Sequence, residues 1–306
     1  MPELPEVQTT VNGLQEHVVG LRITDVWSDY NSPHFKGSAT IKDPLYFARI
    51  KKRIIDTTII SASRRAKNIL IGLSNGCTLL VHLKMTGHLL YGQYRFNTTK
   101  KKDPWEAITP ESLKDPYNKH VHFVLSFSNK KYLALSDVRK FAKVTLIEAG
   151  MSAESDHLHN IGPEPLENKF DFDAFVARIN LRPSGKIKQV LMNQQIIAGI
   201  GNIYADESLW RTGVHPAQKV SDISAKDLRL LFVAIKQTLS RGIDFGGDST
   251  SDYRNIHGNK GEFHESHHAY RRTGTPCDKK GCDGTIVRIV LGGRGTHFCD
   301  KHQRLR

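Results

Sequence analysis

The sequence predicts an α+β protein with more than one domain: a strand-rich N-terminal half, a helical C-terminal half and a short metal-binding segment at the end. Apolar and polar residues alternate through most of the first 150 positions, a pattern typical of half-buried strands. From about residue 166 the apolar spacing becomes helical. Three cysteines and two histidines then cluster between positions 277 and 302. A chain of 306 residues can hold two cores.

One helix is expected at the start of the N-terminal half, because apolar residues from Val7 to Val18 recur at helical spacing and the stripe ends at Gly20. Asn75-Gly76 predicts a hairpin turn. Residues 98–116 are charged and poor in periodic apolar residues, so we expect a surface loop there. Alternating segments predict strands at residues 58–64, 69–73, 78–82, 121–127, 132–135 and 144–148.

The C-terminal half predicts helices joined by glycine-containing turns. Gly213 and Gly242 suit helix C-caps, and Ser224 with Asp227 resembles a capping box. Residues 246–261 predict a mobile, glycine-rich loop. The helices are expected at residues 171–179, 185–192, 202–211 and 224–241. The predicted domains are residues 1–150, a linker at 151–165, a helical domain at 166–270 and a metal-binding segment at 271–306.

The charge of the chain indicates a nucleic-acid partner. Lys and Arg number 44 against 31 Asp and Glu, which gives a formal net charge of +13. Phosphate is the natural counter-charge, although charge alone does not distinguish DNA from RNA. No apolar run is long enough to cross a bilayer, no signal peptide is evident, and no basic amphipathic helix or lipidation signal favours a membrane surface. We therefore expect a soluble, intracellular protein without a membrane partner.

The cysteine cluster predicts a structural zinc site. Cys277 and Cys282 form one ligand pair, and Cys299 and His302 form a second pair after 16 intervening residues. Four N/S ligands close a tetrahedron and leave no open position for catalysis. His297 is close enough in sequence to be the alternative fourth ligand, and a metal-free hairpin with incidental cysteines is the remaining alternative.

The N-terminus, Met1-Pro2-Glu3-Leu4-Pro5-Glu6, predicts an amine nucleophile if Met1 is removed. An α-amino group has a pKa of about 8 against about 10.4 for lysine, so about a tenth of it is unprotonated at neutral pH. A secondary amine and an aldehyde carbon form an iminium ion, which is typical of amine lyases. The alternative is that Pro2 and Pro5 simply lead into a helix whose dipole the glutamates complement.

Six ordered segments resolve this ambiguity through their resemblance to a known family. The chain from Pro2 to Val7 and the terminal cysteine cluster resemble motifs of the formamidopyrimidine-DNA glycosylase family of base-excision repair enzymes. Between them, in the order of that family, stand Arg64-Arg65-Ala66-Lys67, His82-Leu83-Lys84-Met85-Thr86-Gly87, Asp137-Val138-Arg139-Lys140-Phe141 and Gly199-Ile200-Gly201-Asn202-Ile203-Tyr204-Ala205-Asp206-Glu207. The resemblance implies an N-terminal β-sandwich, a helix-two-turn-helix domain and a β-hairpin zinc finger. It also implies a monomer with damaged double-stranded DNA as its partner and no small-molecule cofactor.

The resemblance also implies roles for individual residues. Pro2 would be the nucleophile, Glu3 the proton donor, and Glu6 a residue that positions the terminus. Lys67 and His82 would grip phosphates beside the lesion, and a loop within residues 248–263 would cap it. Met85, Arg139 and Phe141 would fill the space left by the rotated base, and Asn202 and Arg294 would bind phosphate. On residues alone, Asn202 suits a helix N-cap.

The finger departs from the family pattern, which usually has four cysteines and a tighter first pair.

The family reaction is attack of the proline amine on C1′, followed by β- and δ-elimination. The leucine at position 4 and the pair Arg139 and Phe141 favour oxidised purines such as 8-oxoguanine and formamidopyrimidines. An endonuclease VIII-like enzyme for oxidised pyrimidines, a non-catalytic damage-binding protein and a zinc-organised RNA-binding protein are the alternatives. The implied location is the cytoplasm of a bacterium, in association with the nucleoid.

Overall fold

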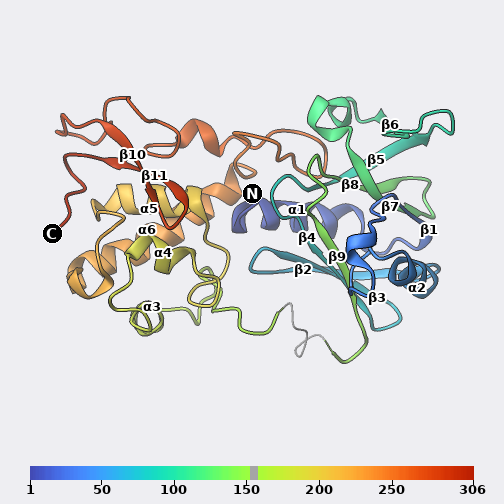
Figure 1. Cartoon of the computed structure of the whole chain (residues 1–306), viewed down its shortest axis with the longest axis horizontal. Coiled ribbons are helices and arrows are strands. Elements are labelled where there is room, and N and C mark those ends of the chain that lie inside the picture. The colour runs from blue at the N-terminus through green and yellow to red at the C-terminus, as the bar shows by residue number, and fades with distance from the viewer. Residues whose placement is uncertain (152–157) are drawn as a thin grey trace. The chain divides into compact units, whose positions relative to one another are not determined.

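The computed structural model describes residues 1–151 and 158–306, so part of the predicted linker, residues 152–157, lies outside the described chain. The chain forms two compact units (Figure 1). The N-terminal unit comprises residues 1–159 together with 245–262, and the C-terminal unit comprises residues 160–244 and 263–306. The segment 245–262, assigned from the sequence to the helical domain, therefore packs with the N-terminal unit.

The N-terminal unit is a sandwich of two antiparallel sheets with flanking helices α1 (Leu4–His17) and α2 (Pro44–Ile54). The predicted strands are all present, and the turn at Asn75-Gly76 joins two of them. The five-stranded sheet has the order β1 (Ile23–Ser28), β7 (Val121–Phe127), β8 (Tyr132–Ser136), β5 (His88–Phe96) and β6 (Trp105–Thr109). The four-stranded sheet has the order β2 (Ile59–Arg65), β3 (Asn68–Leu73), β4 (Thr78–His82) and β9 (Lys143–Ile147).

Sequence periodicity misses four elements of this unit: α2, β1, β5 and β6. The prediction of a surface loop over residues 98–116 is wrong in part, because the segment contains β6 and a 3-10 helix, Glu111–Lys114. β6 pairs with β5 alone as an edge strand, so its outer residues stay exposed and the alternation is weak. Trp105 and Leu113 are nevertheless buried in a small apolar cluster and anchor the segment.

Residues 246–261, predicted to be a mobile loop, belong to the segment 245–262 that is packed in the N-terminal unit. Tyr253, Arg254 and Ile256 are buried, and the Ile256 carbonyl accepts a hydrogen bond of 2.7 Å from the Tyr91 amide. Arg254 also forms an ion pair of 3.1 Å with Asp115. These side chains give the segment fixed contacts in spite of its glycines.

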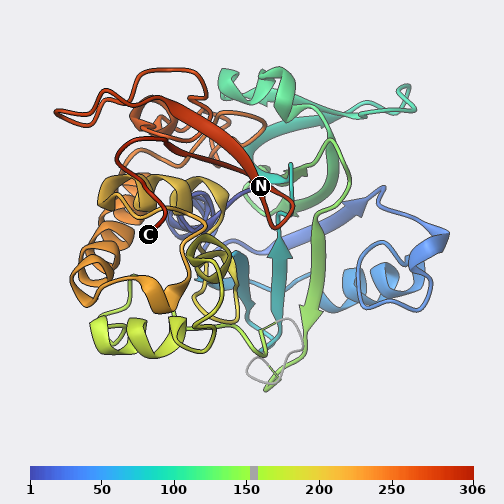
Figure 2. The ribbon, with the colours of Figure 1, turned by 60° about the vertical axis from the view of Figure 1, so that its left-hand side comes forward.

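The C-terminal unit contains the four predicted helices and a terminal hairpin. The helices are α3 (Phe172–Ile179), α4 (Ile187–Met192), α5 (Asn202–Thr212) and α6 (Ala225–Asp244), and the hairpin strands are β10 (Ile286–Leu291) and β11 (Arg294–Cys299). Figure 2 shows this hairpin in red. Between α4 and α5, the Gln194 side chain accepts from the Gly199 amide and donates to the Ile200 carbonyl, both at 2.8 Å. The two turns before α5 are thereby fixed. Among the described residues, no helix is long and apolar enough to cross a membrane.

The two glycines expected as C-caps behave differently. Gly213 ends α5 in the left-handed conformation with φ of 73°, as predicted. The prediction for Gly242 is wrong, because α6 continues through it to Asp244. A Cβ atom at Gly242 would lie 2.5 Å from Cε1 of Tyr204, so the glycine permits the close approach of α5 and α6.

We expect Gly242→Ala to lower the free energy of unfolding by roughly 1–3 kcal/mol through overpacking against Tyr204. The sign of this change tests the steric explanation. Alanine is intrinsically a better helix former than glycine by about 1 kcal/mol, so without a clash the substitution would stabilise the protein. Urea unfolding measures the change. Ser240→Ala on the exposed side of the same helix is the matched control and should be nearly neutral. A stabilised Gly242→Ala variant would contradict the steric explanation.

Candidate functional site

The N-terminus is fixed by a reciprocal capping box at the start of α1. Glu3 is the N-cap residue and its side chain accepts the Glu6 amide, while Oε2 of Glu6 accepts the Glu3 amide at 2.7 Å. Both glutamates are at most 2% exposed. Pro2 is buried with Met1 in place, and Met1 itself is 42% exposed. The expected nucleophile and proton donor therefore stand next to each other at a rigid helix start.

Glu6 also connects this terminus to the segment 245–262. Its Oε1 accepts the Asp248 amide at 2.8 Å, and its backbone carbonyl accepts the Tyr253 hydroxyl at 3.0 Å. Burial, and after it the Glu6 charge, raises the pKa of Tyr253. Tyr253 therefore stays a neutral donor at physiological pH. Glu6 therefore holds the start of α1 and the segment 245–262 together.

Lys67 and His82 lie at neighbouring positions of the four-stranded sheet. Lys67 directly precedes β3, whose first residue Asn68 pairs with His82 at the end of β4, and Lys143 of β9 faces His82 from the other side. Lys67 is only 5% exposed. Cationic side chains therefore gather where the ends of β3, β4 and β9 meet, and this end of the sheet is suited to bind an anion such as phosphate.

His82 is neutral in this environment. Burial, followed by the charges of Lys84 and Lys67, lowers its pKa to about 3. Its Nδ1 accepts a hydrogen bond of 3.0 Å from the Lys84 amide, so the ring proton resides on Nε2. His82 can therefore donate one hydrogen bond to a phosphate oxygen without being charged.

Two loops carry the residues expected to fill the space left by a rotated base, and one buried carboxylate joins them. Asp137, fully buried, accepts a short hydrogen bond from Thr86, next to Met85, and a 2.7 Å bond from the Ala142 amide, next to Phe141. The Arg139 guanidinium lies 4.4 Å from the centre of the Phe141 ring. Asp137 therefore fixes the Met85 loop and the Arg139–Phe141 loop relative to each other.

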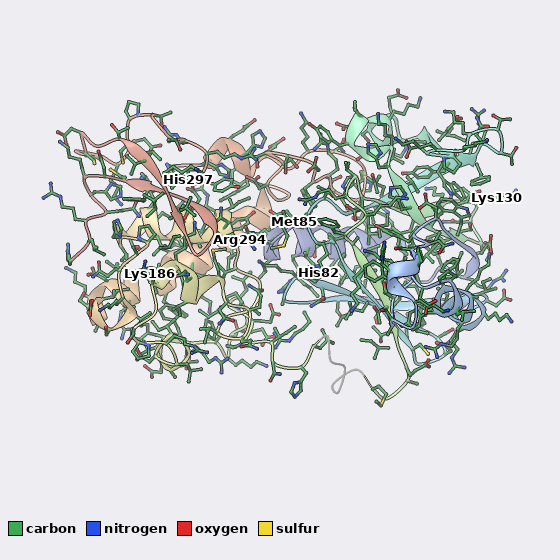
Figure 3. The ribbon with its side chains drawn as sticks, viewed as in Figure 1. His82, Met85, Lys130, Lys186, Arg294 and His297 are labelled. Atoms are coloured by element: carbon green, nitrogen blue, oxygen red, sulfur yellow. The ribbon has the colours of Figure 1, made fainter. Side chains whose placement is uncertain are left out.

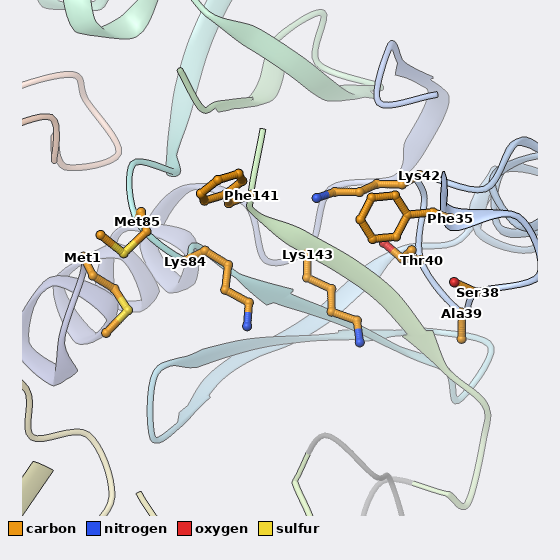
Figure 4. A pocket seen from close by; sticks show the side chains of 10 residues that line it. All are labelled: Met1, Phe35, Ser38, Ala39, Thr40, Lys42, Lys84, Met85, Phe141 and Lys143. Carbon is orange, nitrogen blue, oxygen red and sulfur yellow. The ribbon is translucent and has the colours of Figure 1, made fainter. Parts of the chain in front are cut away.

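A cavity of about 510 Å³ connects these loops with the N-terminus. Met1, Met85 and Phe141 line it together with Lys84 and Lys143, whose side chains extend in the same direction (Figure 4). Burial, and after it the charge of Lys84, lowers the pKa of Lys143. An apolar surface that also carries repelling cations is suited to a ligand with both flat apolar and anionic parts, such as a DNA strand.

In the C-terminal unit, Asn202 binds the terminal hairpin at the residue that follows Arg294. Asn202 is the first residue of α5, and its Nδ2 donates to the Gly295 carbonyl at 3.0 Å. The suggestion that Asn202 is the N-cap is wrong, because Gly201 occupies that position. Arg294 begins β11 after the turn Gly292-Gly293 and is exposed (Figure 3). The first amides of α5 and the Arg294 guanidinium can therefore serve one anion-binding region.

A buried ion pair holds the hairpin at this position. Nζ of Lys188 lies 2.7 Å from Oδ1 of Asp206, both residues are 1% exposed, and the same Nζ donates to Thr296 at 2.8 Å. Oδ2 of Asp206 accepts the His297 amide at 3.0 Å and lies 3.2 Å from its Nδ1. His297 is therefore committed to Asp206.

The metal-ligand candidates converge on a single point. The ligand atoms of Cys277, Cys282, Cys299 and His302 all lie within 4.8 Å of one another. Nδ1 of His302 is 3.4 Å from the Cys277 sulfur and 3.7 Å from that of Cys282. A tetrahedral Zn²⁺ site needs edges of roughly 3.5–3.8 Å, so the group could hold a metal ion. Nε2 of His302 lies 3.0 Å from the Trp210 carbonyl, which orients the ring.

Sequence reasoning assigned no role to Asp137 or Lys188. Asp137 stands inside a recognised motif, but nothing in the sequence reveals that it reaches Thr86 some 50 residues earlier. Lys188 resembles any other lysine of a basic chain, and only its nearly complete burial distinguishes it. Cys77 is buried in the sandwich core.

Comparisons with known proteins agree with the resemblance. Residues 1–144 match the family described as the formamidopyrimidine-DNA glycosylase N-terminal domain, and residues 161–254 match the formamidopyrimidine-DNA glycosylase H2TH domain. A formamidopyrimidine-DNA glycosylase from Roseiflexus sp. (strain RS-1) is 35% identical over 304 residues, which cover 99% of this chain and 100% of the relative.

Solved structures are similar over the same length. A complex between the Lactococcus lactis Fpg and DNA containing an abasic site is 30% identical, with a TM-score of 0.81 and coverage of 99% of both chains. MutM in complex with DNA containing carbocyclic 8-oxo-G is 30% identical, with a TM-score of 0.80 and coverage of 99% of this chain and 100% of the other.

We expect His82 to make the stability of the protein depend on pH. Its folded-state pKa of about 3 lies below the unfolded value of 6.5, so its contribution is complete above pH 6.5 and is lost as the pH falls. Between pH 7 and pH 5 the parent should lose up to about 2 kcal/mol more than His82→Gln. Urea unfolding of both proteins at the two pH values measures this. Equal losses would contradict the buried neutral state of His82.

Proposed function

The chain belongs to the formamidopyrimidine-DNA glycosylase family, and on this basis we propose that it is a bifunctional DNA glycosylase and AP lyase of base-excision repair that acts on oxidised purines. One observation supports this most directly: the residue preceding Pro2 lines the same cavity as Met85 and Phe141. The terminal amine and the base-replacing side chains thus belong to one surface. Family relatives bound to DNA with carbocyclic 8-oxo-G and with Fapy-dG support the choice of purines over oxidised pyrimidines.

In the proposed reaction, the Pro2 amine released by removal of Met1 attacks C1′ of the damaged nucleoside. The bond from C1′ to the base nitrogen breaks, and a ring-opened iminium ion forms. Glu3 delivers a proton to the sugar ring oxygen, a role suited to a buried carboxyl group held at a helix start. Loss of a proton from C2′ then expels the 3′ phosphate, and a second elimination expels the 5′ phosphate. Glu6 orients the terminus throughout by holding the Glu3 amide.

The proposed DNA contacts divide between the two units. In the N-terminal unit, Lys67 and neutral His82 bind phosphates beside the lesion, while Met85, Arg139 and Phe141 replace the rotated base. The stacking of Arg139 on Phe141 supports their joint insertion. In the C-terminal unit, Asn202 and Arg294 bind phosphate. We further propose that the protein is monomeric, needs no small-molecule cofactor and works on the bacterial chromosome in the cytoplasm.

We propose that the metal ion is one structural Zn²⁺ held by Cys277, Cys282, Cys299 and His302. The chemistry of three thiolates and an imidazole suits zinc, and four protein ligands leave no position for a reacting water. The site would tie β10 and β11 to the C-terminal end of α5 through the contact of His302 with Trp210. Arg294, at the other end of the hairpin, then depends on it for position.

Borohydride trapping on a duplex with 8-oxoguanine opposite cytosine tests the proposed reaction. We expect a covalent adduct that peptide mapping places on Pro2. Pro2→Gly and a form that retains Met1 are the matched variants, and the latter should form no adduct on Pro2 because the proline nitrogen is then part of a peptide bond and cannot attack C1′. Binding without an adduct or strand cleavage, on this duplex and on one with an oxidised pyrimidine, would leave only a damage-binding protein.

Metal analysis of single variants tests the ligand assignment. The purified protein should carry one Zn²⁺ per chain, and His302→Ala and Cys282→Ser should lose most of it. His297→Ala is the matched control and should keep its zinc, because His297 binds Asp206 instead. Loss of zinc in His297→Ala but not in His302→Ala would reverse the assignment.

A further inference from the structure

A groove of about 850 Å³ in the C-terminal unit has no part in the proposed reaction. It lies along α6 beside the C-terminal end of α5 and the segment between Cys277 and Cys282. Its apolar floor comes from Leu230, Val233 and Ala234. Leu230 is 49% exposed and Val233 is 44% exposed, so the floor is open to solvent. Exposed apolar surface rimmed by charged residues is typical of a protein-binding site.

The rim of the groove is basic. Four basic residues and one acidic residue are among the described residues that line it. The basic residues are Arg211, Arg229, Lys279 and Lys280, and the acidic residue is Asp278. The Asp278 carboxylate is already paired with Arg272 at 2.7 Å and with His268 at 2.9 Å. The groove therefore presents a surplus of positive charge around an apolar strip.

The wider spacing of the first metal-ligand pair builds one wall of this groove. Lys279 and Lys280 stand between Cys277 and Cys282. Nζ of Lys279 donates to the Arg211 carbonyl at 2.7 Å and lies 5.4 Å from the centre of the Trp210 ring. The segment between Cys277 and Cys282 is thus bound to the end of α5 through Lys279 and does not form a free loop.

Arg211 marks where an anionic group would bind. Its Nε is buried and has no hydrogen-bond partner among the residues that the structure describes. Burial, followed by the charge of Arg241, lowers the pKa of the Arg211 guanidinium. A carboxylate placed in the groove would offset both effects on the Arg211 guanidinium.

We propose that this groove binds a short acidic, amphipathic helical segment of a partner protein. Leu230, Val233, Ala234 and Gln237 follow one another at helical spacing on one face of α6, over a length of about 10 Å. That face matches two turns of an apposed helix with apolar residues at i, i+3 or i+4, and i+7. Acidic side chains flanking this stripe would meet the four cations of the rim.

A protein fits the groove better than DNA does. The phosphate-binding candidate Asn202 starts α5, whereas the groove meets α5 at Trp210, eight residues or about 12 Å further along the helix. Phosphates need cations but gain nothing from an exposed strip of aliphatic side chains. An amphipathic acidic segment uses both parts of the surface.

Fluorescence anisotropy of a labelled peptide with the full-length, zinc-loaded protein tests the proposal. The probe is an amphipathic peptide of about 16 residues with leucines at i, i+3, i+4 and i+7, glutamates beside that stripe and alanines elsewhere to support helix formation. We expect saturable binding that Val233→Glu weakens by at least roughly tenfold, because it places a charge on the apolar floor. Lys280→Glu should weaken binding several-fold, and a scrambled peptide of the same composition should bind more weakly than the probe.

Lys226→Glu is the matched control, because Lys226 is exposed on the same helix outside the groove and the substitution makes the same change in net charge. Zinc content and cleavage of lesion DNA should be unchanged in every variant, which separates this test from that of the proposed reaction. Equal effects of Lys226→Glu and Lys280→Glu, or equal binding of the scrambled peptide, would reduce the result to nonspecific attraction and overturn the proposal. Weaker DNA binding by Lys280→Glu without peptide binding would assign the surface to DNA and overturn it as well.

Discussion

The organisation of the N-terminal unit depends on the buried carboxylate of Glu6. Its two oxygens each accept a backbone amide, one from Glu3 and one from Asp248, which are distant in sequence. A buried charge is costly unless such bonds satisfy it, so the carboxylate imposes a single arrangement on the groups around it. The start of α1 and the segment 245–262 are held in register by this one group. The expected nucleophile, Pro2, directly precedes Glu3 and is positioned by that arrangement.

Two further buried acids play the same part elsewhere in this strongly basic protein. Asp137 fixes the loops of Met85 and Phe141 through hydrogen bonds from Thr86 and from the Ala142 amide. Asp206 binds Lys188 and the His297 amide, and so fixes the hairpin whose turn carries Arg294. Because cations alone would repel one another, the interior carboxylates determine where the exposed basic groups stand. The net charge favours a nucleic-acid partner, and the buried acids shape the surface presented to it.

The sequence predicted the fold class and most elements, because periodicity reports which face of a strand or helix is buried. It missed β6, whose alternation is weak at a sheet edge, and it misread Gly242, whose role depends on Tyr204 of another helix. Motif order identified the family, and spacing identified the metal cluster. Spacing could not distinguish His302 from His297, since only the contact of His297 with Asp206 separates them. The roles of Asp137 and Lys188 were not predicted for the same reason, because these roles lie in contacts between distant segments.

The path of the chain has a consequence for dissecting the protein. The polypeptide passes between the two units near residue 159, again at 244 and once more at 262, because residues 245–262 belong to the N-terminal unit. A cut in the linker would therefore leave the units covalently joined at the two other crossings of the chain, near residues 244 and 262. A fragment ending near residue 159 would lack the Asp248 amide and the Tyr253 hydroxyl that Glu6 binds. The N-terminal half is thus not a self-sufficient module, and domain exchange between relatives must transfer residues 245–262 along with it.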